Sequence, residues 1–124
     1  MTNNNDKNPK PKYDLEERTF QFAKRVRMFV KTLPKSISNH EDSIQVVKSS
    51  GSVGANYREA NEALSKKDFL MRAKISRKEA KETIYWLRMI NETNNLKNHK
   101  EAEGLIREGT EIKKILSKII NNSS

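Results

Sequence analysis

The chain has 124 residues, enough for one domain with a modest core but too few for two. It carries 25 Lys and Arg against 16 Asp and Glu, for a formal net charge of +9, and only 34% of its residues are hydrophobic. The basic balance favours polyanionic partners such as RNA, DNA or an anionic surface, and the absence of cysteine excludes disulfides and thiolate metal sites.

The first twelve residues, MTNNNDKNPKPK, are almost entirely Asn, Lys and Pro, and this composition cannot bury enough surface to become ordered. We predict a disordered basic arm over residues 1–12, a folded domain over residues 13–121 and a short tail over residues 122–124. The N-terminus lacks the apolar stretch of a signal peptide, and no apolar run approaches the roughly 20 residues of a membrane span. We therefore expect a cytoplasmic protein without a membrane partner.

Four segments after the arm open with a short polar residue three positions before an acid, a pattern typical of helix starts. The pairs are Asp14 with Glu17, Asn39 with Asp42, Ser65 with Asp68, and Asn98 with Glu101. Each start is followed by apolar or small residues on one helical face, and the first helix is expected to stop at Pro34. The faces are Leu15, Phe22, Val26, Phe29 and Leu33 on the first helix; Phe69, Ala73, Ser76, Ala80, Thr83, Leu87 and Ile90 on the third; and Ala102, Leu105, Gly109, Ile112, Leu116 and Ile119 on the fourth.

No strand-like alternation competes with these patterns, and the segments are joined by loops of only a few residues. Short connections make neighbouring helices antiparallel. The sequence therefore predicts an all-α fold, an antiparallel up-and-down four-helix bundle.

The second helix contains the run SSGSVGAN, with glycines at positions 51 and 54. A Walker-type phosphate loop needs a preceding strand and a Lys-Ser/Thr pair after its last glycine, and neither is present. On a helix, Gly51 and Gly54 share one face with Ile44 and Val47. Because a helical glycine costs about 1 kcal/mol relative to alanine, we interpret these two as sites where another backbone approaches closely.

A second stripe on the same helix consists of Val46, Val53, Tyr57, Ala60 and Leu64. On the third helix, apolar residues also flank the buried face: Leu70, Ile75, Ile84, Trp86 and Met89. This apolar arc is wider than one neighbouring helix covers, so it indicates either a thick intramolecular core or a subunit interface. We favour the interface, because the chain is otherwise poor in apolar residues.

Catalytic and metal-binding patterns are hard to find. His40 and His99 both lie beside predicted helix starts, where they are expected to be exposed. The carboxylates Glu59, Glu62, Glu79 and Glu82 could suggest a di-iron site, but none has the histidine three residues later that such sites use. We therefore expect no enzyme, no metal site and no cofactor.

The cations are more ordered than the carboxylates. Along one edge of the third helix lie Lys67, Lys74, Lys78, Lys81 and Arg88, with Arg77 beside them. The first helix carries Phe20, Lys24, Arg27 and Lys31 at steps of four, three and four. Such stripes are often only solvated faces. Cations spaced along a rod also match phosphates along a nucleic acid, however, and an exposed phenylalanine can stack on an unpaired base.

The stretch from Asp14 to Ile90 resembles the bacterial four-helix proteins called 23S rRNA intervening-sequence proteins. The matching text is DLEERTFQFAKRV, LPKS, SSGSVGANYREA, SKKDF and KEAKETIYWLRMI, with Ala60 where many members have glycine. The resemblance implies a bundle that assembles into a ring-like homopentamer. It also implies a related branch that serves the reverse transcriptase of diversity-generating retroelements through a basic surface. Packing or interface roles are expected for Gly51, Gly54, Asn56, Tyr57, Glu59, Glu79, Glu82 and Trp86.

Two functional hypotheses follow. In the first, the protein is an oligomeric, non-catalytic accessory factor that binds RNA or another nucleic acid through the basic stripes, with a reverse transcriptase as a candidate protein partner. In the second, it is a protein-interaction scaffold whose charge keeps it soluble or docks an acidic protein. The adjacent genes would discriminate between the two.

Overall fold

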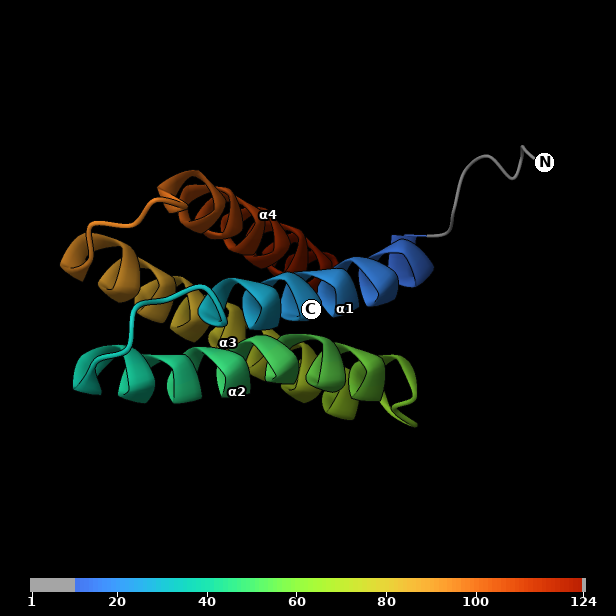
Figure 1. Cartoon of the computed structure of the whole chain (residues 1–124). Helices are drawn as coiled ribbons and strands as arrows, with labels where there is room; N and C mark the ends of the chain where they lie inside the picture. Colours follow the sequence, from blue (N-terminus) through green and yellow to red (C-terminus); the bar gives the residue numbers. More distant parts are fainter. Residues whose placement is uncertain (1–10, 124) are drawn as a thin grey trace.

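The computed structural model describes the backbone of residues 11–123 and the side chains of residues 15–123. Within this part of the chain there are four helices, α1 (Pro11–Val30), α2 (Ile37–Asn61), α3 (Lys66–Thr93) and α4 (His99–Ser123). They run up and down, α1 packs against α2 and α4, and it lies diagonally from α3 (Figure 1). The predicted all-α four-helix architecture is confirmed. None of these helices has the length and apolar character needed to cross a membrane.

The helix boundaries differ from the predicted ones at several ends. α1 begins at Pro11, inside the predicted arm, so Asp14 lies within the helix and does not cap it; residues 1–10 lie outside the described part. A proline suits the first helical position, because its missing N–H would have no partner there. α1 ends at Val30 rather than Leu33, and α4 continues to Ser123, inside the predicted tail.

The cap of α2 was also predicted at the wrong residue. Ser36 caps this helix, and its Oγ accepts a hydrogen bond of 3.0 Å from the backbone N–H of Asn39. Asn39 is instead buried and faces the loop after α3, where its Nδ2 donates to Pro34 O at 2.8 Å and to Asn94 Oδ1 at 2.9 Å. Asn94 Nδ2 in turn donates a 2.8 Å hydrogen bond to Asn39 Oδ1. At α3 the prediction is correct, since Ser65 Oγ accepts from Asp68 N.

The buried faces of the helices form one main core. The predicted seam of α3 from Ala73 to Ile90 is fully buried, and on α4 the last buried position is Ile120 rather than Ile119. Gly109 makes room in this core, because a Cβ there would lie 3.1 Å from Ile84 and 3.3 Å from Phe22. Thr19 of α1 is also fully buried. The apolar pattern of the sequence did not include it, because its side chain is polar.

α2 and α3 meet through small polar side chains. Ser76 Oγ donates a 2.6 Å hydrogen bond to Val53 O, and Thr83 Oγ1 lies 2.9 Å from Ser49 Oγ. These short side chains bring the two helices close together, and their hydroxyls find partners without water. The run SSGSVGAN is therefore the segment where α2 packs against its neighbours.

The apolar arcs of α2 and α3 are largely covered within the subunit. Val46, Val53, Tyr57 and Ala60 belong to the core, whereas Leu64 is fully exposed. Three flanking residues of α3 are covered in the same way. Leu70 joins a small cluster with Ala60, Ala73 and Ile120. Ile84 lies against Gly109, and Trp86 packs on the main core. Two neighbouring helices thus cover two sides of each arc within the subunit, and the subunit interface stays a prediction.

Ion pairs join α1 to α4. Arg18 makes two hydrogen bonds to Glu108, of 2.7 and 2.9 Å, and Arg25 pairs with Glu101 at 3.1 Å. The bonds from Arg18 lower the pKa of Glu108, against a smaller opposing effect of burial, and the charges of Arg18 and Arg25 lower it further. A carboxylate with a depressed pKa stabilises the fold above its unfolded pKa, and this contribution is lost as the pH falls.

Replacing Glu108 with glutamine should therefore lower the free energy of unfolding by about 1 kcal/mol at pH 7. The loss should shrink as the pH falls from about 4.3, the ordinary pKa of glutamate, through the lower pKa of the folded state. Urea unfolding at pH 7 and pH 3 measures both. Glu111→Gln is the matched control, since Glu111 faces Lys114 at 3.7 Å in an exposed pair. Equal losses in the two variants would contradict the prediction.

Candidate nucleic-acid interface

The outer face of α3 carries a row of exposed lysines, which we call the α3 lysine row: Lys67, Lys74, Lys78 and Lys81. These side chains lie opposite the buried seam, because steps of seven, four and three residues keep them on one side of the helix. None of the four forms an ion pair or hydrogen bond with any other residue that the structure describes. Lys74, Lys78 and Lys81 line a shallow hollow of about 400 Å³.

The two arginines predicted for this surface are partly engaged. Arg88 pairs with Glu92 at 3.2 Å, so its charge is locally balanced at the end of the row. Arg77 is half-buried on the side facing α4, where its Nη1 donates to Ser117 Oγ at 3.3 Å. Arg77 also lines the hollow, and its bond to a neutral hydroxyl leaves its charge unbalanced, so of the two arginines only Arg88 is neutralised by an ion pair.

An aromatic residue that sequence reasoning missed lies among the lysines. Tyr85 is 54% exposed and lines the same hollow, and its ring meets the edge of Trp86 with centroids 4.8 Å apart. Trp86 Nε1 in turn donates a 3.2 Å hydrogen bond to Glu82 Oε1. This bond orients Glu82, the one carboxylate that lines the hollow. The signal was available, because Tyr85 follows Lys81 by four residues and Lys78 by seven.

The cations of α1 face another side of the molecule. Lys24, Arg27 and Lys31 are exposed, as is Phe20 at 61%. Because α1 and α3 are diagonal in the bundle, the outward faces of these helices point in opposite directions (Figure 1). The structure thus does not bring the two predicted stripes together into one surface within a subunit.

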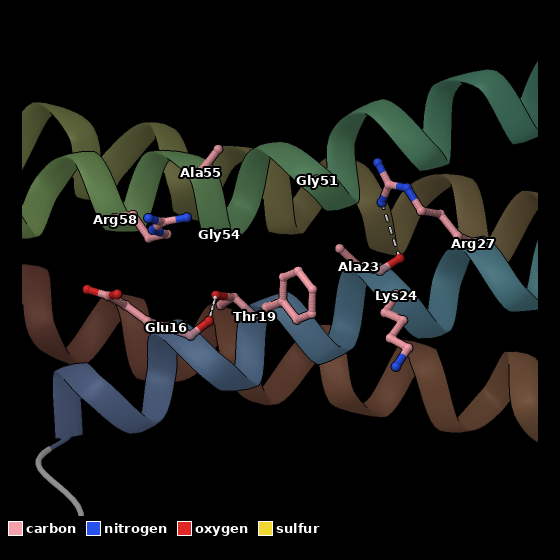
Figure 2. Close-up of a pocket in the computed structure, with 10 residues that line it drawn as sticks. Glu16, Thr19, Ala23, Lys24, Arg27, Gly51, Gly54, Ala55 and Arg58 are labelled. Atoms are coloured by element: carbon pink, nitrogen blue, oxygen red, sulfur yellow. Dashed lines mark hydrogen bonds between the residues drawn. The ribbon is translucent and has the colours of Figure 1, made fainter.

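Lys24 and Arg27 instead border a groove of about 350 Å³ between α1 and α2, which we call the α1–α2 groove; Lys31, one residue beyond the end of α1, does not line it. Its α2 side is lined by the small residues Gly51, Gly54 and Ala55 and by Arg58. Figure 2 shows Arg27 reaching from α1 toward Gly51, while Arg58 of α2 and Glu16 lie toward the other end. Arg58 escaped the sequence reasoning because no periodicity on one helix could place it beside α1.

Comparison with known proteins gives a clear relationship. Residues 12–118 match the family model described as 23S rRNA-intervening sequence protein. The chain belongs to this family. A similar solved structure is a protein of unknown function from the S23 ribosomal protein family of Bacteroides thetaiotaomicron, with 34% sequence identity and a TM-score of 0.75 over 86% of this chain and 97% of that one. A search of the curated proteins finds no match.

Several residues expected at interfaces of this 23S rRNA-intervening sequence protein contact their own subunit. Asn56 Oδ1 accepts from Arg72 Nη1 of α3 at 3.1 Å. Tyr57 is buried, which raises the pKa of its hydroxyl, although the hydrogen bond with Asn61 partly opposes this. Glu59 is exposed, and Glu79 is half-buried in a hollow beside Lys78.

The carboxylates of this family member do not converge on a metal site in the described part of the chain. No group of three or more His, Asp or Glu side chains among residues 15–123 could hold a metal ion. His40 and His99 are both exposed, as the sequence predicted.

Proposed function

We propose that this protein is a non-catalytic RNA-binding accessory factor whose contact surface is the α3 lysine row. The observation that carries the proposal is the row of unpaired, exposed lysines, which runs from Lys67 to Lys81, or about 21 Å along the helix. Each ammonium group can approach a phosphate oxygen without first breaking an ion pair within the described part of the subunit. A net charge of +9 adds a long-range attraction for polyanions.

The family description refers to 23S rRNA intervening sequences, so a structured RNA is the first polyanion to test. Lysines act as point charges and contact phosphates without reading base edges. Binding should therefore depend strongly on salt and weakly on sequence. Tyr85 adds a ring on which an unpaired base could stack within the same hollow.

Changing Lys74, Lys78 and Lys81 together to glutamate tests the proposal. We expect affinity for a structured RNA to fall by at least about tenfold at 0.15 M salt. The slope of the logarithm of the binding constant against the logarithm of the salt concentration should become shallower by about two to three, because each lost phosphate contact removes roughly 0.7–0.9 from it. Fluorescence anisotropy over a salt series measures both quantities.

The matched control is Lys97→Glu, Lys100→Glu and Lys118→Glu, which makes the same change in net charge at exposed lysines away from α3. It should weaken binding less and leave the slope nearer the parent value. Equal effects in the two triple variants would show that only net charge matters. An unchanged affinity in the α3 variant would leave the α3 lysine row a solvated face and favour a protein-interaction scaffold.

The proposal extends to assembly and partners. The resemblance seen in the sequence implies a ring-like homopentamer with a reverse transcriptase as a candidate partner, and the basic charge also suits another acidic protein. A cyclic ring would repeat the α3 lysine row around the assembly and multiply its field. Light scattering of the parent protein measures the number of subunits, and a single-subunit mass at micromolar concentration would remove the ring from the proposal.

A further inference from the structure

The α1–α2 groove combines features that the α3 lysine row lacks. Its α2 side is lined by Gly51, Gly54, Ala55 and Arg58. Arg27 and Thr19 of α1 pack over the two glycines, so the low part of the α2 side that stays exposed is Ala55. Phe20, on the α1 side, is 61% exposed although it is a large apolar ring. A ring beside a low wall offers a face against which a planar group could stack.

The charges around the groove are mostly positive and available. Lys24 and Arg58 form no hydrogen bond or ion pair with the residues that the structure describes, and Arg27 bonds only to Ala23 O, at 3.2 Å. Glu16 is the one carboxylate that lines the groove, where its Oε2 accepts from Asn61 Nδ2 at 2.8 Å, and Glu17 lies beside Phe20 in the adjoining hollow. The three cations of the groove thus outnumber its single carboxylate. The groove therefore carries an unbalanced positive rim, which complements an anionic occupant.

We propose that the α1–α2 groove binds an unpaired nucleotide of a single-stranded RNA segment. The base would stack on Phe20, and the flanking phosphates would be held by Arg58 with Arg27 or Lys24. Stacking needs an unpaired base, whereas phosphate contacts do not, so this groove would distinguish single strands from duplexes. The inference rests on the proposed function and adds a second contact surface of different chemistry to it.

The test compares three variants on two RNA probes, a single-stranded oligonucleotide and a fully paired duplex. Phe20→Leu keeps an apolar side chain but removes the aromatic face. It should weaken single-strand binding by about fivefold or more while changing duplex binding less than twofold. Phe20→Tyr, which keeps a ring, should retain most of the affinity. Met28→Ala, at an apolar residue of α1 that is 56% exposed and outside the groove, should change neither.

A direct contact can be located by photo-crosslinking. A single-stranded oligonucleotide containing 4-thiouridine should crosslink to the tryptic peptide of residues 19–24, which contains Phe20. Arg58→Gln should lower the salt slope for the single strand by about 0.7, the value of one phosphate contact. No crosslink in residues 19–24, or equal losses on both probes in Phe20→Leu, would overturn the inference.

The remaining outcomes separate this inference from the proposed function. If Phe20→Leu changes the subunit number in light scattering, the groove is a contact between copies of the chain and the inference is overturned. If the parent binds no RNA at all, the proposed function fails and the inference fails with it. If the triple lysine variant loses affinity while Phe20→Leu loses none, only the groove inference is overturned.

Discussion

Replacing Gly54 with valine is expected to lower the free energy of unfolding by about 2–3 kcal/mol, the cost of overpacking a tight contact. A Cβ at position 54 would lie 2.8 Å from Thr19 Oγ1, 3.2 Å from Thr19 Cβ and 3.6 Å from the Thr19 carbonyl carbon. Thr19 is fully buried, and its hydroxyl donates to Glu16 O at 2.9 Å, so it cannot rotate away freely. α1 would have to move away from α2. Urea unfolding monitored by circular dichroism measures the loss.

A double-mutant cycle isolates the contact. Thr19→Ala removes the atom closest to the introduced side chain. The double variant should therefore lose about 1 kcal/mol less unfolding free energy than the sum of the losses of the two single variants. Gly104→Ala is the control, because the nearest atoms to a Cβ there are side-chain ends, led by Arg25 Nη2 at 3.4 Å. That change should stabilise the protein by about 0.5–1 kcal/mol through helix propensity. A stable Gly54→Val variant with no coupling would show that α1 and α2 do not approach closely here.

Replacing Asn39 with aspartate is expected to cost about 3 kcal/mol at neutral pH, although the side chain keeps its shape. The amide nitrogen of Asn39 donates to both Pro34 O and Asn94 Oδ1, whereas a carboxylate oxygen would repel both acceptors. The position is only 4% exposed, so water cannot compensate. The change would loosen the loop before α2 and its link to the end of α3.

The same substitution should make stability depend on pH. Burial and the two facing oxygens raise the pKa of the introduced carboxyl above its unfolded value. The penalty is therefore full above the raised pKa and declines as the pH falls through it, reaching its lowest value below about 3.9, where the carboxyl is protonated in both states. Unfolding curves at pH 7 and pH 4 measure the decline. Asn95→Asp, at an exposed residue in the same loop as Asn94, is the control and should cost little at either pH.

The arrangement of the two candidate surfaces constrains how RNA could contact the protein. The α3 lysine row lies on α3, whereas Phe20 of the α1–α2 groove lies on α1, the helix diagonal to it, so a straight duplex on α3 cannot also reach Phe20 of the same subunit. An RNA with a paired stem and an unpaired tail could contact both only by bending around the bundle or by using two subunits. The variants at Lys74, Lys78 and Lys81 and at Phe20 should therefore act on separate parts of one RNA.

The sequence alone was sufficient for the features that depend on local periodicity. The seam of α3 from Ala73 to Ile90, the cap at Ser65 and the exposure of Lys74, Lys78 and Lys81 all follow from spacing along one helix. These predictions needed no knowledge of the neighbouring helices, because a helix of known period has only one way to divide its faces.

What only the tertiary structure decided was the pairing of faces between helices. The N-cap of α2 is Ser36 rather than Asn39, because Asn39 forms a hydrogen bond with Asn94, 55 positions later. The tertiary structure covered the apolar arcs of α2 and α3 within the subunit, and it placed Arg58 beside Phe20 at the α1–α2 groove. Such contacts join residues far apart in the sequence, and no pattern along one helix specifies which neighbour its second face will meet.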